Sequence, residues 1–154
     1  GQVDRGGHGG AARRVKFAAR TSWTGSTGEG WEHYDRTHEA SVSEQTVSLT
    51  TAEGKGDPRL ANPELLLLAA ASSCQMLWFL HLAAKARIDV TGYEDDCEAE
   101  MPDDRLTRIV LRPRITIAGE FSKDRAMHLC ELAHKECNIA KSLSCPVVLE
   151  PHLV

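Results

Sequence analysis

The chain has 154 residues, of which 42% are hydrophobic and 26% are charged. This composition is typical of one ordinary globular domain, and it excludes disordered and collagen-like chains. Lysine and arginine number 18 and aspartate and glutamate 22, which gives a formal net charge of −4. A mildly acidic chain of this kind is not expected to bind nucleic acid through bulk electrostatic attraction.

The first 20 residues carry the opposite charge. They hold five basic residues and one acidic residue, and residues 6–10 read Gly-Gly-His-Gly-Gly. Glycine-rich segments are flexible, so we expect residues 1–14 to form a flexible tail or leader. The segment has no apolar stretch like that of a secretory signal. Residues 15–154 are expected to form a single domain.

The N-terminal part of that domain is predicted to contain antiparallel strands. Residues 15–24 alternate loosely between apolar and polar types, and three glycines in residues 25–30 predict a turn. A second strand is predicted over residues 31–42 and a third over residues 47–50. Residues 51–61 contain two glycines and a proline, which indicates a loop.

A long helix is predicted over residues 63–86. Asn62 is a typical N-cap residue, Pro63 suits the first helical position, and Glu64 places negative charge at the positive end of the helix dipole. Residues 65–84 are long and apolar enough to span a membrane. Four polar residues in and beyond the middle favour a buried central helix instead: Ser72, Ser73, Gln75 and His81. A helix that is apolar on nearly every face needs cover all round, which suggests a dimer.

The C-terminal part predicts further strands and a second helix. The expected elements are strands over 88–101 and 106–119, a helix over 123–137 and a strand over 147–154. Pro113 interrupts the second of these strands, which indicates an edge or a bulge. Ser122 is the expected N-cap of the helix. The order of elements defines an α+β fold with mainly antiparallel strand pairs.

Five cysteines stand at irregular spacing and form no CxxC pair; they are Cys74, Cys97, Cys130, Cys137 and Cys145. Without an export signal, reduced thiols in a cytoplasmic protein are expected. Most free cysteines are small buried residues, so packing is the simple interpretation of each. An odd number nevertheless leaves at least one thiol that could be reactive.

Two motifs give a more specific indication. Asn62-Pro63-Glu64 is followed by an apolar, alanine-rich stretch and by Cys74, ten residues after the glutamate. This pattern resembles the central-helix signature of the OsmC/Ohr family of thiol peroxidases. Residues 137–142, Cys-Asn-Ile-Ala-Lys-Ser, resemble the second family motif, in which a cysteine is followed by a small segment ending in a basic residue.

The chain also departs from the family pattern. Asn138 and Ala140 stand where proline and serine are common, and Gln75 stands where an aromatic residue often follows the first cysteine. These differences concern substrate preference and the reactivity of the second cysteine more than the fold. They suggest a divergent branch of the family.

The resemblance covers residues 15–154 and implies a fold and a reaction. The fold would be an intertwined α+β homodimer with N-terminal antiparallel strands and the two central helices inside. Cys74 would reduce an organic hydroperoxide or hydrogen peroxide and become a sulfenic acid, and Cys137 would resolve it as a disulfide. A thiol reductant, such as a dithiol or lipoyl-type donor, would restore the thiols. No metal, haem or flavin is implied, and no nucleic acid or membrane partner is expected.

Cys74 would need a nearby cation, because the thiolate is the nucleophile and burial disfavours it. No basic residue lies within four residues of Cys74. The family uses an arginine and the glutamate of its first motif; Arg36, in the predicted second strand, is the first choice and Arg59 the second. Arg36 could instead be an ordinary exposed strand residue, and Arg59 a solvated loop residue. Glu64 lies about 15 Å from Cys74 along a straight helix. Either an arginine spans this distance or a partner chain supplies the glutamate. Stabilisation of the helix dipole alone could also explain a glutamate at this position.

Two further residues lie near Cys74 on the predicted helix. His81 shares its face about 10 Å away and could line the pocket, although a buried core histidine is the favoured interpretation. Trp78 lies one turn from Cys74 and could form a wall of an apolar peroxide pocket or pack in the core. His134 could assist Cys137, but a surface position is favoured for it.

Three functions were therefore compared. The first is the two-cysteine hydroperoxide reductase. The second is a non-enzymatic OsmC-like protein that binds an apolar or acyl ligand in the same pocket. The third is a metal site, which is disfavoured because its candidate residues lack the usual ligand spacing. Those candidates are Cys74, His81, His38 and His134.

Overall fold

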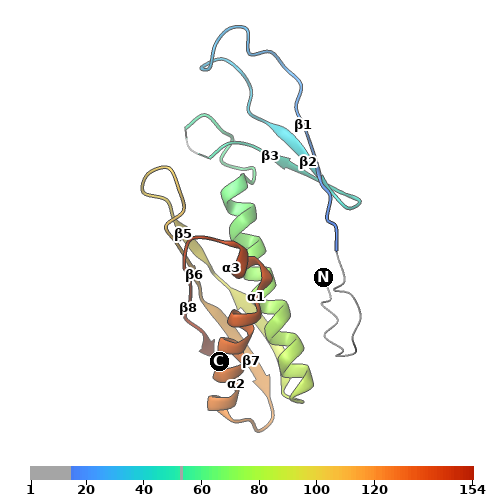
Figure 1. Cartoon of the computed structure of the whole chain (residues 1–154), viewed down its shortest axis with the longest axis vertical. Coiled ribbons are helices and arrows are strands. Elements are labelled where there is room, and N and C mark those ends of the chain that lie inside the picture. The colour runs from blue at the N-terminus through green and yellow to red at the C-terminus, as the bar shows by residue number, and fades with distance from the viewer. Residues whose placement is uncertain (1–14, 53) are drawn as a thin grey trace. The chain divides into compact units, whose positions relative to one another are not determined.

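The computed structural model describes residues 15–154 except residue 53. The expected tail at residues 1–14 lies outside the described residues. The chain forms two compact units, Gly1–Pro63 and Glu64–Val154, and each is described separately below (Figure 1).

The first unit contains a small antiparallel sheet. Its strands are β1 (Arg20–Ser22), β2 (His38–Val42) and β3 (Gln45–Leu49), in the order β1-β2-β3. Ala40 of β2 and Leu49 of β3 are buried. The prediction of antiparallel strands in this part of the chain is confirmed.

The second strand is shorter than predicted, because residues 31–37 form turns. Gly30 has a φ of 97°, and the His33 N–H donates to its carbonyl at 3.1 Å. The Asp35 carboxylate then accepts the Thr37 N–H at 2.9 Å. Local hydrogen bonds of this kind compete with the strand ladder, so the strand begins only after Thr37.

The loop after β3 folds back on itself. Ala61 forms a parallel bridge with Leu49, and the buried Thr50 hydroxyl accepts the Asp57 N–H at 3.3 Å. Gly56 packs so closely that a Cβ there would lie 2.2 Å from the Thr51 carbonyl oxygen. The glycine is therefore required by this loop, which leads directly into the long helix.

The second unit is organised by the long helix α1 (Pro63–Lys85). Its N-terminus is as predicted and its end differs by one residue. The helix stops where Arg87 adopts a φ of 56°. The Ile88 N–H then donates to the Ala83 carbonyl at 2.9 Å and the Arg87 N–H to the Ala84 carbonyl at 3.1 Å. This is a Schellman motif, with arginine at a position that usually holds glycine.

Each long strand predicted for the C-terminal part is divided into two. The strands are β4 (Asp89–Asp95), β5 (Glu98–Glu100), β6 (Arg108–Leu111), β7 (Pro113–Ala118), β8 (Val147–Leu149) and β9 (His152–Leu153). They form two three-stranded sheets, in the orders β4-β7-β9 and β5-β6-β8. The pairs β4–β7 and β5–β6 are antiparallel, whereas β6–β8 and β7–β9 are parallel.

The break at Arg112 has a local cause. Its N–H donates to the Asp95 carboxylate at 2.6 Å rather than to a neighbouring strand, and Pro113 follows without an N–H to donate. Pro151 lies between β8 and β9 in the same way. The strand is interrupted near the expected place, at Arg112, but Pro113 begins β7, the middle strand of its sheet, so the expected edge or bulge at Pro113 was wrong.

Two helices follow the strands. Helix α2 (Lys123–Glu136) begins as predicted, with the Ser122 hydroxyl accepting the Arg125 N–H at 3.2 Å. Helix α3 (Asn138–Ser142) was not predicted. Cys137 lies between the two helices, at the C-cap of α2 and the N-cap of α3.

Helices α1 and α2 lie side by side against the strands of this unit (Figure 1). The main core joins Phe79 and Ala83 of α1, Ile115 and Ile117 of β7, and the buried face of α2. A second core, near the start of α1, contains Leu68, Ile109, Leu111 and Cys145. These two clusters fix α1 against the sheets on one side.

The other side of α1 is exposed within one chain. Of its most apolar 18-residue window, 22% is buried, and by length and composition the helix could cross a membrane. Leu65, Leu66 and Leu77 are 50%, 39% and 60% exposed. In a single chain, the side of α1 that we expect a dimer to cover is therefore exposed.

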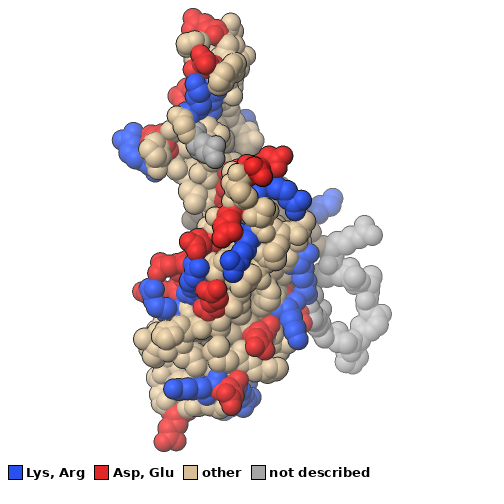
Figure 2. Space-filling model, turned by 90° about the vertical axis from the view of Figure 1, so that its left-hand side faces the viewer, with Lys and Arg blue, Asp and Glu red and all other residues tan. Residues whose placement is uncertain are grey.

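Positive and negative side chains are interspersed on the face shown in Figure 2. The second unit also contains ion pairs between neighbouring strands and loops. Arg112 pairs with Glu98 at 2.7 Å and Glu150 at 3.0 Å, and Arg114 pairs with Glu94 at 2.9 Å and Asp96 at 2.7 Å. These pairs are exposed and contribute little to stability individually.

Candidate active site

The fold of the second unit brings Cys74 and Cys137 together. Cys74 lies midway along α1 and is half-buried, while Cys137 lies between α2 and α3 and is buried. The two thiols are free, and Cys74 lies close enough to Cys137 to affect its ionisation. Two cysteines from distant parts of the sequence thus form one side-chain pair.

The surroundings of Cys137 disfavour its thiolate. Burial, together with hydrogen bonding to and charge repulsion from Cys74, raises the pKa of Cys137 to about 11, although backbone N–H groups of α3 oppose the shift. One of those groups, the Ala140 N–H, lies 3.4 Å from the Cys137 sulfur. At neutral pH Cys137 is therefore a protonated thiol, and its S–H is available to the Cys74 sulfur.

We expect Cys137 to resist alkylation in the native protein. At pH 8 a thiol with this pKa is ionised in about one molecule in a thousand, so iodoacetamide should modify Cys137 about a hundredfold more slowly than in the unfolded chain. The rate should rise about tenfold per pH unit towards pH 11. Timed alkylation with peptide mass mapping measures it, and equal rates in native and unfolded protein would contradict the expectation.

The same shift makes the free energy of unfolding depend on pH. Because the folded-state pKa is raised from its ordinary value of 9.0, the stabilisation from the protonated Cys137 is fully present below about pH 9. It is lost as the pH rises from there towards 11. Burial acts in the same direction on Cys130, whose pKa it raises to about 12.

Hydrogen bonds from α1 flank the cysteine pair. The buried Gln75 donates its side-chain N–H to the Cys130 carbonyl of α2 at 3.0 Å. Trp78 donates its indole N–H to the Asn138 side-chain oxygen at 2.9 Å. Neither bond was predicted from the sequence. Gln75 Oε1 is buried and has no hydrogen-bond partner among the residues the structure describes.

Trp78 and His81 lie together on α1. Their rings meet edge to face at a centroid distance of 5.8 Å. His81 is exposed in a single chain, so the core of one chain does not bury it. Trp78 is half-buried and its polar edge is occupied by Asn138. Its role as a wall of a peroxide pocket stays a prediction.

Glu64 lies at the start of α1, and α1 is continuous from Pro63 to Lys85. The separation of about 15 Å from Cys74 expected for a straight helix therefore applies. Glu64 Oε2 is buried and accepts no hydrogen bond within the described part of the chain. An unpaired buried carboxylate oxygen is energetically costly, so a cationic or hydrogen-bonding partner is expected for it.

Arg36 belongs to the first unit and lies two residues before β2, not within a strand as predicted. Its guanidinium donates to the Tyr34 carbonyl at 2.7 Å and to the Trp31 carbonyl. The guanidinium carbon also lies 3.7 Å from the centroid of the Tyr34 ring. Arg36 is half-buried and held by the turns, so its interpretation as an exposed strand residue was wrong.

Arg36 also lines a cavity of about 450 Å³ within the first unit. The walls combine two aromatic rings with polar side chains; the lining residues are Trp23, Thr27, Tyr34, Arg36, His38, Thr50, Thr51 and Pro63. The cavity therefore offers an apolar surface beside a fixed positive charge.

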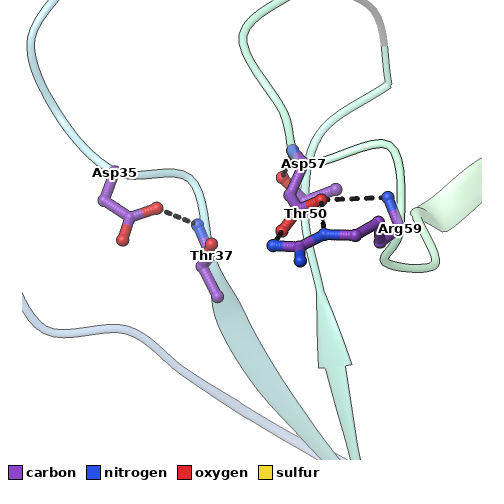
Figure 3. Close-up of polar contacts among 5 residues, drawn as sticks. All are labelled: Asp35, Thr37, Thr50, Asp57 and Arg59. Carbon is purple, nitrogen blue, oxygen red and sulfur yellow. Dashed lines mark hydrogen bonds and ion pairs between the residues drawn. The ribbon is translucent and has the colours of Figure 1, made fainter.

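Arg59 is arranged differently. It forms an ion pair with Asp57 at 2.9 Å, its Nε donates to the same carboxylate at 3.1 Å, and its side chain is 86% exposed (Figure 3). The hydrogen bond from Arg59 lowers the pKa of Asp57. The structure matches the plainer interpretation of Arg59 as a solvated loop residue.

The remaining cysteines and histidines occupy other places. Cys130 and Cys145 belong to the two cores, and Cys97 packs against the second of them. His134 is half-buried rather than on the surface, with Nδ1 unpartnered among the described residues. Among residues 15–154 without residue 53, no group of three or more His, Cys, Asp or Glu could hold a metal ion.

The fold and the cysteine pair together define a class of protein. It is an α+β protein in which a cysteine of a long central helix meets a second cysteine at the end of the following helix. The OsmC-like protein family model matches residues 54–152. The chain belongs to this family. No curated protein sequence matches the chain significantly.

Solved structures show the same fold. An OsmC-like protein of unknown function from Vibrio cholerae O1 biovar eltor is 26% identical, with a TM-score of 0.82 over 90% of this chain and 99% of that chain. An organic hydroperoxide resistance protein OsmC from Legionella pneumophila is 16% identical, with a TM-score of 0.60 over 91% and 98%. The organic hydroperoxide resistance protein OhrB from Bacillus subtilis is 18% identical, with a TM-score of 0.57 over 90% and 98%.

Proposed function

We propose that this protein is a cysteine-based hydroperoxide reductase. The observation that carries the proposal is the proximity of the Cys74 and Cys137 thiols in a chain of the OsmC-like family. Structural neighbours described as organic hydroperoxide resistance proteins support it.

In the proposed reaction the Cys74 thiolate attacks one oxygen of the hydroperoxide. The O–O bond breaks, an S–O bond forms, and the leaving oxygen takes a proton and departs as an alcohol or as water. The Cys137 sulfur then attacks the Cys74 sulfenic acid, an S–S bond forms and water leaves. A dithiol donor, of lipoyl type or another, reduces this disulfide and is itself oxidised to a disulfide.

The two cysteines have different roles in this scheme because their surroundings differ. Cys137 is buried and stays protonated, while Cys74 is half-buried and can receive a hydrogen bond from it. Cys74 is thus the member of the pair suited to attack a peroxide that comes from solvent. Arg36 would supply the cation that favours the thiolate, and Glu64 would orient that arginine. Free thiols suit a reducing, cytoplasmic environment.

Peroxide consumption coupled to a dithiol tests the proposal. The wild-type chain, an organic hydroperoxide and a dithiol should consume one peroxide per dithiol oxidised, with the same ratio over many turnovers. Hydrogen peroxide, assayed in parallel, shows which substrate class is preferred. Failure of the chain to accelerate either reaction above the protein-free rate would refute the enzymatic function.

One observation favours the alternative of ligand binding, namely the cavity of about 450 Å³ beside Arg36. Its aromatic walls and positive charge suit a small apolar acid. This function predicts a saturable rise in melting temperature with a fatty or aromatic carboxylate and no disulfide after peroxide treatment. The peroxidase function predicts the disulfide.

We also propose that the protein is a homodimer in which the exposed side of α1 is covered by a second chain. Leu77 is 60% exposed on this helix, so Leu77→Glu should place a charge in the interface and convert the dimer to monomers. Sedimentation equilibrium measures the change, and Glu131→Gln, an exposed change on α2, is the control. A wild-type monomer at micromolar concentration would contradict the proposal.

A further inference from the structure

Two residues that depart from the common family pattern lie beside the cysteines. Gln75 follows Cys74, and Asn138 follows Cys137. Both take part in hydrogen bonds from α1 to the segment that carries Cys137. The two residues that differ from the common family pattern therefore take part in the hydrogen bonds that join α1 to the Cys137 segment.

The two hydrogen bonds bracket Cys137 along the chain. Gln75 binds the carbonyl of Cys130, two turns before Cys137 on α2, at 3.0 Å. Trp78, one turn after Cys74, binds the side chain of Asn138, immediately after Cys137, at 2.9 Å. Both donors follow Cys74 within about one turn of α1, and the acceptors lie on both sides of Cys137, so the bonds restrain the sulfurs relative to each other.

The Cys137 segment joins α2 to the five-residue α3. The Cys137 N–H donates to the His134 carbonyl at 3.4 Å, its sulfur accepts the Ala140 N–H at 3.4 Å, and its carbonyl accepts the Lys141 N–H at 3.0 Å. These bonds lie within α2 and α3, whereas the bonds from Gln75 and Trp78 connect the segment to α1. A proline at position 138 would have no side-chain acceptor for the Trp78 N–H.

We propose that Trp78 and Asn138 are positioning residues that hold the Cys137 thiol against the Cys74 sulfur, with Gln75 as a second, buried tether. The inference rests on the proposed function, because it concerns formation of the Cys74–Cys137 disulfide. The tethers raise the effective concentration of one thiol at the other, which favours the disulfide over the separated thiols. Trp78 thus acts through Asn138, and this role does not require it to touch the peroxide.

The thiol–disulfide equilibrium of the full chain tests this without peroxide. The protein is equilibrated with defined ratios of oxidised and reduced dithiothreitol, quenched with acid and alkylated. Mass mapping then gives the fraction of Cys74–Cys137 disulfide. Trp78→Phe removes the indole N–H, and Asn138→Leu removes the acceptor. Each should shift the equilibrium towards the thiols about three- to tenfold, as expected for loss of one hydrogen bond.

Two further variants separate positioning from general damage to the fold. Asn138→Asp keeps an acceptor oxygen for Trp78 and should stay within about twofold of wild type. The double variant Trp78→Phe/Asn138→Leu should equal the single variants, because both remove the same bond. Circular dichroism and melting temperature confirm that each variant is folded. Trp31→Phe, in the first unit, is a matched aromatic control.

The possible results separate a failure of the positioning role from a failure of the proposed function. Wild-type equilibria in Trp78→Phe and Asn138→Leu, or additive losses in the double variant, would overturn the positioning role while the disulfide itself still supports the proposed function. A wild-type chain that forms no Cys74–Cys137 disulfide at any ratio would overturn both. Losses in the single variants with retention in Asn138→Asp would support the inference.

Discussion

Replacing Cys74 with serine is expected to abolish peroxide reduction. The serine hydroxyl is not ionised at neutral pH and cannot form a sulfenic acid, so the rate should fall by at least about 10³-fold. The substitution is close to isosteric, and Cys74 is only half-buried, so the fold should be retained. The measurement is the rate of loss of an organic hydroperoxide in the presence of a dithiol.

Cys97→Ser is the matched control for this prediction. Cys97 is also half-buried and lies in the same unit, but burial and the charge of Asp95 raise its pKa. A thiol in that state is a poor nucleophile, and its variant should keep the wild-type rate. A Cys74→Ser protein with undiminished activity, or an inactive Cys97→Ser protein, would show that the wrong sulfur has been assigned.

Replacing Arg36 with methionine is expected to lower kcat/KM for the peroxide by about 10²- to 10³-fold. This is the usual effect of removing a group that stabilises developing negative charge in an active site. Arg36→Lys keeps the charge but loses the planar fork of donors, so it should recover only part of the rate. The rising limb of the pH–rate profile should move to higher pH in Arg36→Met, because the cation favours the attacking thiolate.

Arg59→Met tests whether this effect is specific to Arg36. Arg59 is exposed and paired with Asp57, so its loss should leave kcat/KM within about twofold of wild type. Because Arg36 also binds the carbonyls of Tyr34 and Trp31, the melting temperature of each variant must be compared with wild type. Loss of activity in Arg59→Met with retention in Arg36→Met would reverse the assignment.

The sequence predicted the long helix well because its signals are local. Asn62, Pro63 and Glu64 mark the start, and the apolar run that follows is long enough to leave little ambiguity. The second helix was equally clear from Ser122. Elements determined by a few neighbouring residues in this way can be predicted without knowledge of tertiary structure.

The strand boundaries depend on interactions that a local pattern does not contain. The break at Arg112 is stabilised by Asp95 from another strand, and residues 31–37 form turns through side-chain contacts with the backbone. The parallel pairing of β8 and β9 with β6 and β7 joins segments far apart in the sequence. Helix α3 is too short for hydrophobic periodicity to reveal it.

The candidate site was predicted in part. The pairing of Cys74 with Cys137 was implied only by the family resemblance, since the two residues have no local relation. The tethers from Gln75 and Trp78 were missed, although the replacement of common family residues at positions 75 and 138 was a usable signal. The exposure of His81 could not be deduced because the surrounding helix is apolar on nearly every face.

A thiol count before and after one equivalent of an organic hydroperoxide, with peptide mass mapping, is the most direct test of the central claim. The protein starts with five free thiols. We predict the loss of two thiols and a single linked peptide that joins Cys74 to Cys137. Survival of all five thiols, or a linkage that omits Cys74, would contradict the claim that this chain is a two-cysteine hydroperoxide reductase.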